Sequence, residues 1–430
     1  MRKCPAGDRG RGKIGTVSVT NATADLATFE GQTLFRDGSA GQALGSGRMP
    51  KKRYLFTPGP TPVPPEVLEV LARPAIHHRG PDFKQAYERV LARLKEVFRT
   101  EHDVLLFTSS GTGAFESAVA NLTEPGERAL VVSHGNFGER WAQMVGRYGA
   151  ELDHLRYAWG ESPDPADVRE RAAGAAVVYL VHSETSTGVV SDLQPLAAAA
   201  KEQGALVVVD AVSSLAAVRC ETDAWGLDVV VSGSQKALMT PPGLGLVSVS
   251  PAALAKAARG GAARFYFDWE RTRAAQEKVD AAFTPAVPLV LGLDVALGLI
   301  LDEGLEAAFE RHLRLGRATR AGIKAMGLEL ASPDEDRSAV VTTVWAPDGL
   351  DVAAFLLDLR DRLGVQLIGG QGEWRSKVFR IGHIGYFEIF DITTALGAVE
   401  TGMVEAGVEI ERGVAVTAAL EAYEGARTRT

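Results

Sequence analysis

Short apolar runs alternate with amphipathic stretches in the part of the chain that follows residue 80. Apolar residues recur at helical spacing from Asp82 to Arg99, which predicts an amphipathic helix. Further helical patterns begin near Gly113 and Phe137. Continuous apolar runs, typical of strands buried on both faces, occupy residues 103–107, 129–133, 175–183, 205–210 and 227–233. Because strands and helices alternate, we predict an α/β fold with a mostly parallel sheet and right-handed crossovers.

The pattern changes after about residue 285. Alanine- and leucine-rich helical stretches are followed by a new set of strands and helices, at residues 288–326, 339–347, 352–363 and 377–384. We therefore predict a large domain at residues 49–304, a smaller α+β domain at 305–412 and a tail at 413–430.

The first residues of the chain have a different composition. Residues 1–48 are rich in Gly, Ser, Thr and Ala and contain few large apolar residues, so we expect a mostly disordered extension. Met49 directly precedes PKKRYLFTPGP, where ordered sequence begins, and is therefore an alternative start of the protein.

Charge and cysteine content exclude several classes of protein. The formal net charge of −8 gives no general attraction to nucleic acid. No apolar run reaches the roughly 18 to 20 residues that cross a bilayer, and the N-terminus lacks the apolar segment of a signal peptide. Cys4 and Cys220 form neither a disulfide framework nor a metal-binding pair. We expect a cytoplasmic protein without membrane or nucleic-acid partners.

A loop of small residues, TSSGTGAFES, follows the predicted strand at 103–107. In open α/β sheets, ligands bind at this carboxyl edge of the strands. Backbone N–H groups and the positive end of the next helix favour an anion there. Ser110, Gly111 and Thr112 are the candidate phosphate contacts. A capped turn without a ligand is the alternative.

Two charged residues end later strands. Asp210 follows four apolar residues, where a buried carboxylate needs a cation or several donors, and a protonated pyridine nitrogen is such a cation. A loop cap is the alternative role. Lys236 follows a buried strand and a Ser-Gly-Ser turn. Loss of solvation there lowers the pKa of its amine and frees it to attack an aldehyde. A solvated surface charge is the alternative role.

Together these motifs resemble the class V aminotransferases of pyridoxal 5'-phosphate (PLP) fold type I, and within them the alanine–glyoxylate and serine–glyoxylate aminotransferase group. The similarity runs from about Leu55 to Glu411. The motifs that carry it are TPGPTPVPP (57–65), SSGTGAFESAVAN (109–121), HGNFGERW (134–141), HSETSTG (182–188), VDAVSSL (209–215), SGSQKALMTPPG (232–243) and KVFRIGHIG (377–385). The resemblance implies a large PLP-binding domain with a seven-stranded type of sheet and a small C-terminal domain.

The resemblance also implies roles around the cofactor ring. Lys236 would be the Schiff-base lysine and would then move a proton. Asp210 would bind the pyridine nitrogen, and Val212 would pack beside the ring. Phe137 would stack on the ring face, where related enzymes often carry Trp. Read without the family, Phe137 is a core residue instead.

Further roles concern the phosphate and the substrate. The phosphate contacts implied are Ser110, Gly111, Thr112 (in place of a frequent His), Gln235 and, from a second subunit, Thr284. Thr185 would bond the 3-oxygen of the cofactor or Asp210, and Gly59 would line the substrate pocket. Arg380 would bind the substrate carboxylate through a bidentate fork. A structural carboxylate is the alternative partner of Arg380.

The activity implied is transamination by a ping-pong mechanism, from alanine or serine to a keto acid, glyoxylate by resemblance. Aspartate, with Arg79 or Arg264 as a second cation, and ureidoglycine are alternative donors within the group. A class V lyase or desulfurase is less well supported, because neither Cys4 nor Cys220 is placed for it. A binding protein without activity would have lost part of the set that holds the cofactor ring.

The expected assembly is a homodimer with shared active sites, because Thr284 is expected to complete the phosphate site of the partner. No metal is expected. The adjacent residues His77 and His78 point in different directions on most backbones, and no set of carboxylates lies near them.

Overall fold

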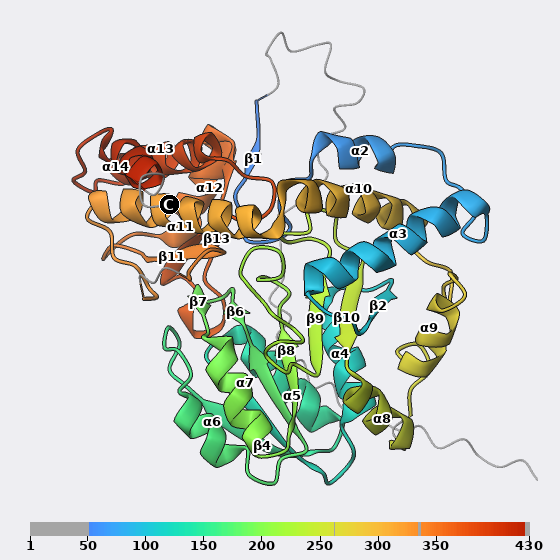
Figure 1. Cartoon of the computed structure of the whole chain (residues 1–430). Coiled ribbons are helices and arrows are strands. Elements are labelled where there is room, and N and C mark those ends of the chain that lie inside the picture. The colour runs from blue at the N-terminus through green and yellow to red at the C-terminus, as the bar shows by residue number, and fades with distance from the viewer. Residues whose placement is uncertain (1–50, 262, 334–336, 426–430) are drawn as a thin grey trace, which may run out of the picture. The chain divides into compact units, whose positions relative to one another are not determined.

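A seven-stranded sheet lies at the centre of the fold, in a unit that begins at Lys52 (Figure 1). The computed structural model describes residues 51–261, 263–333 and 337–425. The predicted extension and the alternative start at Met49 lie outside these residues. Across the sheet, the strands are β2 (Asp103–Phe107), β10 (Gly245–Val249), β9 (Val229–Gly233), β8 (Leu206–Asp210), β5 (Val177–Val181), β3 (Arg128–Ser133) and β4 (Glu151–Arg156). β10 is antiparallel to both of its neighbours, and the other pairs are parallel. The predicted mostly parallel α/β sheet is confirmed.

Helices cover both faces of this sheet, as the continuous apolar runs require. One face packs against α3 (Pro81–Phe98), α6 (Pro165–Arg171), α7 (Leu193–Glu202) and α10 (Val287–Glu303). The other packs against α4 (Gly111–Leu122), α5 (Asn136–Arg147), α8 (Pro251–Arg259) and α9 (Trp269–Gln276). Successive residues of β5 alternate between the two faces: Val178 and Leu180 pack on the face covered by α3, and Tyr179 packs on the face covered by α4.

The C-terminal elements have a hydrophobic core of their own, separate from the apolar layers on the two faces of the sheet, and we call it the second core. They are α11 (Leu305–Ala325), β11 (Val341–Trp345), α12 (Val352–Asp358), a π-helical turn η1 (Leu359–Leu363), β12 (Val365–Gln366), β13 (Ile368–Gly369), a 3-10 turn η2 (Gly372–Trp374), β14 (Val378–Gly382), α13 (Ile389–Glu405) and α14 (Val414–Gly425). β11, β14 and β13 form an antiparallel sheet. Gly304, in the left-handed region with φ of 85°, separates α10 from α11. It coincides with the domain boundary that we propose, which stays a prediction.

The N-terminal described segment contributes to this second core. β1 (Tyr54–Leu55) pairs with β12, and Phe56 is buried among the C-terminal apolar residues. The remaining elements are α2 (Pro65–Leu71) and the hairpin of β6 (Ser183–Glu184) and β7 (Val189–Val190). After Phe56 the chain enters the loop TPGP (57–60), whose Pro58 contacts Lys236 at the end of the seven-stranded sheet. This loop therefore connects the second core to the sheet.

The sequence pattern missed two strands of the seven-stranded sheet and several two-residue strands outside it. β4 has the sequence ELDHLR and pairs only with β3, so that it lies at the sheet edge and shows no apolar run. β10 has the sequence GLVSV, in which only Leu246 and Val247 form a continuous apolar pair before Ser248. The pattern thus identified the strands that contain longer apolar runs.

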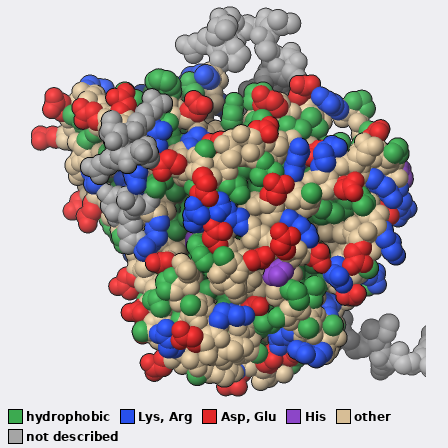
Figure 2. Space-filling model, viewed as in Figure 1, with side chains coloured by type: hydrophobic (Ala, Val, Ile, Leu, Met, Phe, Trp, Pro, Cys, Tyr) green, Lys and Arg blue, Asp and Glu red, His purple; other side chains and the backbone are tan. Residues whose placement is uncertain are grey.

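The described surface shows no broad area of one charge on the face in view. Acidic and basic side chains are interspersed there with apolar ones (Figure 2). None of the helices in the described part of the chain has both the length and the apolar character that crossing a bilayer requires.

Candidate active site

A cavity of about 330 Å³ lies at the carboxyl ends of β2, β8 and β9. This is the edge at which ligands bind in open α/β sheets. Most of the predicted site residues line it: Gly59, Ser110, Gly111, Thr112, Phe137, Thr185, Asp210, Val212, Gln235 and Lys236. Residues that are far apart in sequence therefore line one cavity.

The amine of Lys236 is buried and held by the N-terminal loop. Its Nζ donates to the carbonyl oxygen of Pro58 at 2.7 Å. A Cβ atom built on Gly59, whose φ is 145°, would lie 2.4 Å from Cε of Lys236, so a larger residue would be strained and would displace the lysine side chain. The Thr61 hydroxyl donates to the carbonyl oxygen of Lys236 at 2.9 Å. Burial, with a smaller effect from the charge of Arg380, lowers the pKa of Lys236 to about 8.

Asp210 ends β8 and lies in the same cavity. Its carboxylate accepts one hydrogen bond, from the backbone N–H of Val212 at 2.9 Å. Burial raises the pKa of Asp210 to about 7, and the negative charge of Glu184 acts in the same direction. A cation within the cavity would restore the charged form of this carboxylate.

The first turn of α4 faces the cavity. The Ser110 side chain caps this helix by accepting from the N–H of Gly113 at 3.4 Å. The backbone N–H groups of Gly111 and Thr112 begin the helix and have no partner within it. A Cβ atom on Gly111 would lie 2.9 Å from Cγ2 of Val212, so glycine is needed for this close approach.

Gln235 and Thr185 contribute polar groups to the cavity. Among the described residues, the buried Oε1 atom of Gln235 has no hydrogen-bond partner. The hydroxyl of Thr185 bonds that of Ser213, not the carboxylate of Asp210. A contact of Thr185 with the 3-oxygen of a cofactor stays a prediction.

Two predicted residues do not line the cavity. Arg380 is buried and donates to main-chain oxygens, to Gly369 at 3.0 and 2.8 Å and to Thr185 at 2.8 Å. Burial lowers the pKa of Arg380 to about 10. None of the described carboxylates forms an ion pair with Arg380, so the structure does not show the structural carboxylate that was its alternative partner. Thr284 is exposed beside Tyr266, in a separate small hollow.

The residues that the sequence analysis missed include two charged ones, both near α5. Arg140 lines the cavity, one helical turn after Phe137. Glu184 is fully buried, and its carboxylate accepts from the N–H groups of Phe137 at 2.9 Å and Gly138 at 3.1 Å. Glu184 thus caps the helix that carries both Phe137 and Arg140. Both residues lie in motifs that carry the resemblance, HGNFGERW and HSETSTG, and this was the available signal.

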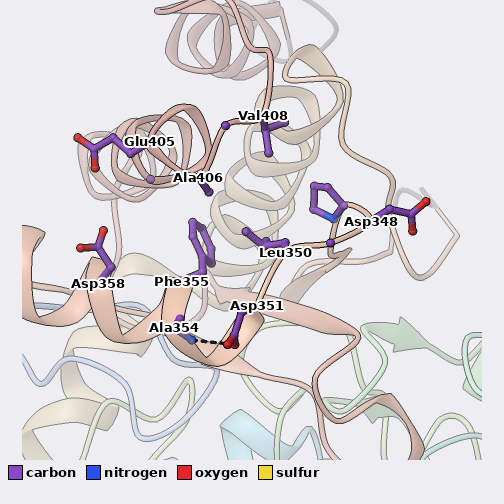
Figure 3. Close-up of a pocket in the computed structure, with 13 residues that line it drawn as sticks. Asp348, Leu350, Asp351, Ala354, Phe355, Asp358, Glu405, Ala406 and Val408 are labelled. Atoms are coloured by element: carbon purple, nitrogen blue, oxygen red, sulfur yellow. Dashed lines mark hydrogen bonds between the residues drawn. The ribbon is translucent and has the colours of Figure 1, made fainter.

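A larger and more open hollow, of about 640 Å³, lies between α12 and the end of α13 (Figure 3). The Phe355 and Leu350 side chains lie at its centre, with the carboxylates of Asp358 and Glu405 on one side. No Lys or Arg side chain lines it, so it offers no cationic group to a phosphate. The chemistry therefore belongs to the cavity at the strand ends.

Among the described residues, no group of three or more His, Cys, Asp or Glu side chains is arranged to hold a metal ion. His77 and His78 stack on each other with ring centroids 4.7 Å apart.

Known proteins share this architecture over almost their whole length. The structure of ureidoglycine–glyoxylate aminotransferase from Bacillus subtilis matches with a TM-score of 0.83 at 30% sequence identity, over 88% of this chain and 100% of that one. The seven-stranded sheet with its cavity at the strand ends is thus the architecture of a PLP fold type I enzyme.

The sequence comparisons identify the family. The family model described as aminotransferase class-V matches residues 53–372. The soluble hydrogenase 42 kDa subunit of Anabaena cylindrica is 40% identical over 87% of this chain and 100% of its own length. Serine–glyoxylate aminotransferase of Methylorubrum extorquens and L-aspartate–glyoxylate aminotransferase of Paracoccus denitrificans are each 35% identical, over 87% of this chain and 97% of theirs. The chain belongs to the class V aminotransferases, a family of PLP-dependent transferases, and to the glyoxylate aminotransferase group within it.

We predict that Glu184→Ala lowers the free energy of unfolding by about 1–3 kcal/mol, because two buried N–H groups of α5 lose their acceptor. Glu184→Gln keeps an acceptor oxygen and should lose less. Urea denaturation followed by circular dichroism measures both. Glu151→Ala, at an exposed glutamate in β4, is the matched control and should unfold like the wild type. Equal stability of Glu184→Ala and wild type would contradict the capping role.

Proposed function

We propose that this protein is a PLP-dependent transaminase that moves the amino group of alanine or serine to glyoxylate by a ping-pong mechanism. One observation carries the proposal: the buried amine of Lys236 and the buried carboxylate of Asp210 line a single cavity, next to the first turn of α4. A helix N-terminus, a desolvated amine and a desolvated acid are the groups that a phosphorylated pyridine aldehyde requires.

The donor set of the cavity fits PLP. The helix N-terminus and the Ser110 and Thr112 hydroxyls suit a phosphate. Asp210 has one hydrogen-bond donor in the described structure and gains a cationic partner in a protonated ring nitrogen. Phe137 and Val212 supply apolar surface for the ring. Residues that would hold the cofactor are therefore Ser110, Gly111, Thr112, Phe137, Thr185, Asp210, Val212, Gln235 and Lys236. When bound, PLP supplies an electron-withdrawing ring that makes the α-proton of an amino acid acidic.

The residues of this chain then perform the remaining tasks. Lys236, with its lowered pKa, is a neutral amine in a useful fraction of molecules at neutral pH, and it binds the aldehyde and carries the α-proton. Asp210 holds the ring nitrogen in its protonated form. Arg380 binds the substrate carboxylate, which would replace its present main-chain acceptors. Gly59 leaves the space beside Lys236 that the substrate needs.

A second subunit would complete the phosphate site. Thr284 lies on the surface, away from the cavity of its own chain. We propose a homodimer in which Thr284 reaches the phosphate site of the other subunit. This arrangement accounts for a predicted contact residue that does not line its own cavity.

The two arginines considered for an aspartate donor lie away from the cavity, which favours a small donor. Arg140 does line the cavity, but it bonds Thr112 at the proposed phosphate end. A second carboxylate needs a further cation, yet Arg79 pairs with Asp280 at 3.8 Å and Arg264 donates to the carbonyl oxygen of Ala257. Neither lines the cavity. Aspartate and ureidoglycine remain the alternative donors. A desulfurase is disfavoured because Cys220 is buried outside the cavity, and burial raises the pKa of its thiol to about 12.

The donor is tested by mixing the purified PLP-loaded protein with alanine, serine or aspartate in separate single-turnover reactions. We expect the visible absorbance of the bound cofactor to change fastest with alanine or serine. Glyoxylate should then restore the original spectrum. A fastest change with aspartate would contradict the proposed donor.

We predict that Lys236→Ala lowers kcat on the order of 1,000-fold or more, because the variant has no amine to bind the aldehyde or to move the proton. Sodium borohydride treatment followed by peptide mass spectrometry should attach PLP to residue 236 of the wild type and to no residue of the variant. Lys377→Ala, at an exposed lysine, is the control and should retain wild-type turnover. Full activity of Lys236→Ala would refute the assignment.

The lowered pKa of Lys236 predicts a pH dependence. Only the neutral amine attacks an aldehyde, so the rate of PLP attachment to the PLP-free protein should rise about tenfold per pH unit below pH 8 and then level off. An exposed lysine would still gain rate up to about pH 10.4. Stopped-flow absorbance from pH 6 to 10 measures this. A rate that still rises steeply at pH 10 would show that the amine is solvated.

A further inference from the structure

Arg140 is a cation in the wall of the cavity, and none of the described carboxylates forms an ion pair or hydrogen bond with it. It lies on α5, three residues after Phe137, and its guanidinium carbon is 4.9 Å from the centroid of the Phe137 ring. Among the described residues its one hydrogen-bond acceptor is Oγ1 of Thr112 at 3.0 Å, and no carboxylate forms an ion pair with it. A half-buried guanidinium at a cavity wall is stabilised by an anion. Its other N–H groups are available to a ligand.

The bond to Thr112 sets the direction of the hydroxyl hydrogen. A guanidinium only donates, so Oγ1 of Thr112 accepts this bond and keeps its own O–H for another acceptor. Thr112 is the second residue of α4, where the backbone N–H groups also lack intrahelical partners. Donors from a helix N-terminus, a hydroxyl and a guanidinium thus gather at one end of the cavity. A hydroxyl that accepts from a cation is also the stronger donor.

The cavity contains no other group that meets this need. Among the described residues that line it, Asp210 is the one carboxylate. Burial raises the pKa of Asp210 and the charge of Arg140 acts to lower it, but the hydrogen-bond partner of this carboxylate is Val212, not Arg140. Arg380 differs from Arg140, because main-chain oxygens satisfy its guanidinium. The guanidinium of Arg140, the hydroxyl of Thr112 and the first N–H groups of α4 are therefore available to an anionic ligand.

We infer that Arg140 and Thr112 act as a pair that binds the phosphate of PLP, with the guanidinium supplying charge and orienting the hydroxyl. This inference rests on the proposed function and adds a phosphate-binding residue to it. The contact of Arg140 with Thr112 places it at the phosphate end of the site, and this distinguishes it from a cation for a second substrate carboxylate.

The test compares PLP with pyridoxal, which has the same ring and aldehyde but no phosphate. The full chain is freed of PLP, and each compound is titrated while absorbance and protein fluorescence are recorded. We expect Arg140→Gln to weaken PLP binding about 10- to 100-fold, the effect of losing a charge-assisted hydrogen bond. Pyridoxal binding should stay within about twofold of the wild type.

Three further variants sharpen the result. Arg147→Gln removes the same charge from an exposed position of α5 and should bind PLP like the wild type. Thr112→Val should weaken PLP binding by itself. Because the two residues act as a pair, the double variant should lose less than the product of the two single losses. The urea midpoints of the PLP-free variants verify that each one folds.

The outcomes separate the competing explanations. Unchanged PLP affinity in Arg140→Gln overturns the inference, and a raised KM for aspartate in the same variant would assign Arg140 to a substrate carboxylate. An equal loss of PLP and pyridoxal affinity also overturns it, since the role would then be support of the Phe137 ring. Wild-type protein that binds neither compound would overturn the proposed function itself.

Discussion

The site depends on the burial of two groups of opposite charge at the ends of neighbouring strands. Asp210 ends β8, Lys236 follows β9, and these two strands pair in parallel. Removal of water shifts the pKa of each group toward its neutral form, to about 7 for the acid and about 8 for the amine. The cavity between them therefore favours a ligand whose own charges complement these two groups. The other features of the site support this arrangement.

The N-terminal loop shows how the second core takes part in the site. Phe56 is buried among the C-terminal apolar residues, and Pro58, two residues later, accepts a hydrogen bond from the amine of Lys236. A Cβ atom on Gly382, at the end of β14, would lie 2.5 Å from the carbonyl oxygen of Thr57. The loop is thus fixed from both sides, by β14 and by the lysine. The contacts with the C-terminal elements thus help to position the carbonyl of Pro58 that accepts from the lysine amine.

Helix α5 is positioned in a similar way by a residue from another segment. Glu184 reaches the first turn of α5 from the β6–β7 hairpin, and a Cβ atom on Gly135 would lie 2.3 Å from Cγ of Glu184. The carboxylate replaces the capping side chain that α5 lacks in its own sequence. One buried anion therefore positions both the aromatic ring and the guanidinium of α5. Its charge adds to the raised pKa of Asp210 and partly opposes the lowering of the pKa of Lys236 by burial.

The sequence by itself determined the α/β class, the strands with apolar residues on both faces, and the strand ends at which Ser110, Asp210 and Lys236 lie. Such features are encoded within a few neighbouring residues, as hydrophobic periodicity and as polar residues that follow an apolar run. Edge strand β4 was missed because four of its six residues are polar or charged. The tertiary structure alone decided that Pro58 bonds Lys236 across 178 residues, that Glu184 caps α5, and that Arg140 meets Thr112. These contacts join distant segments, and packing between the segments sets their geometry, so no local pattern in the sequence records them.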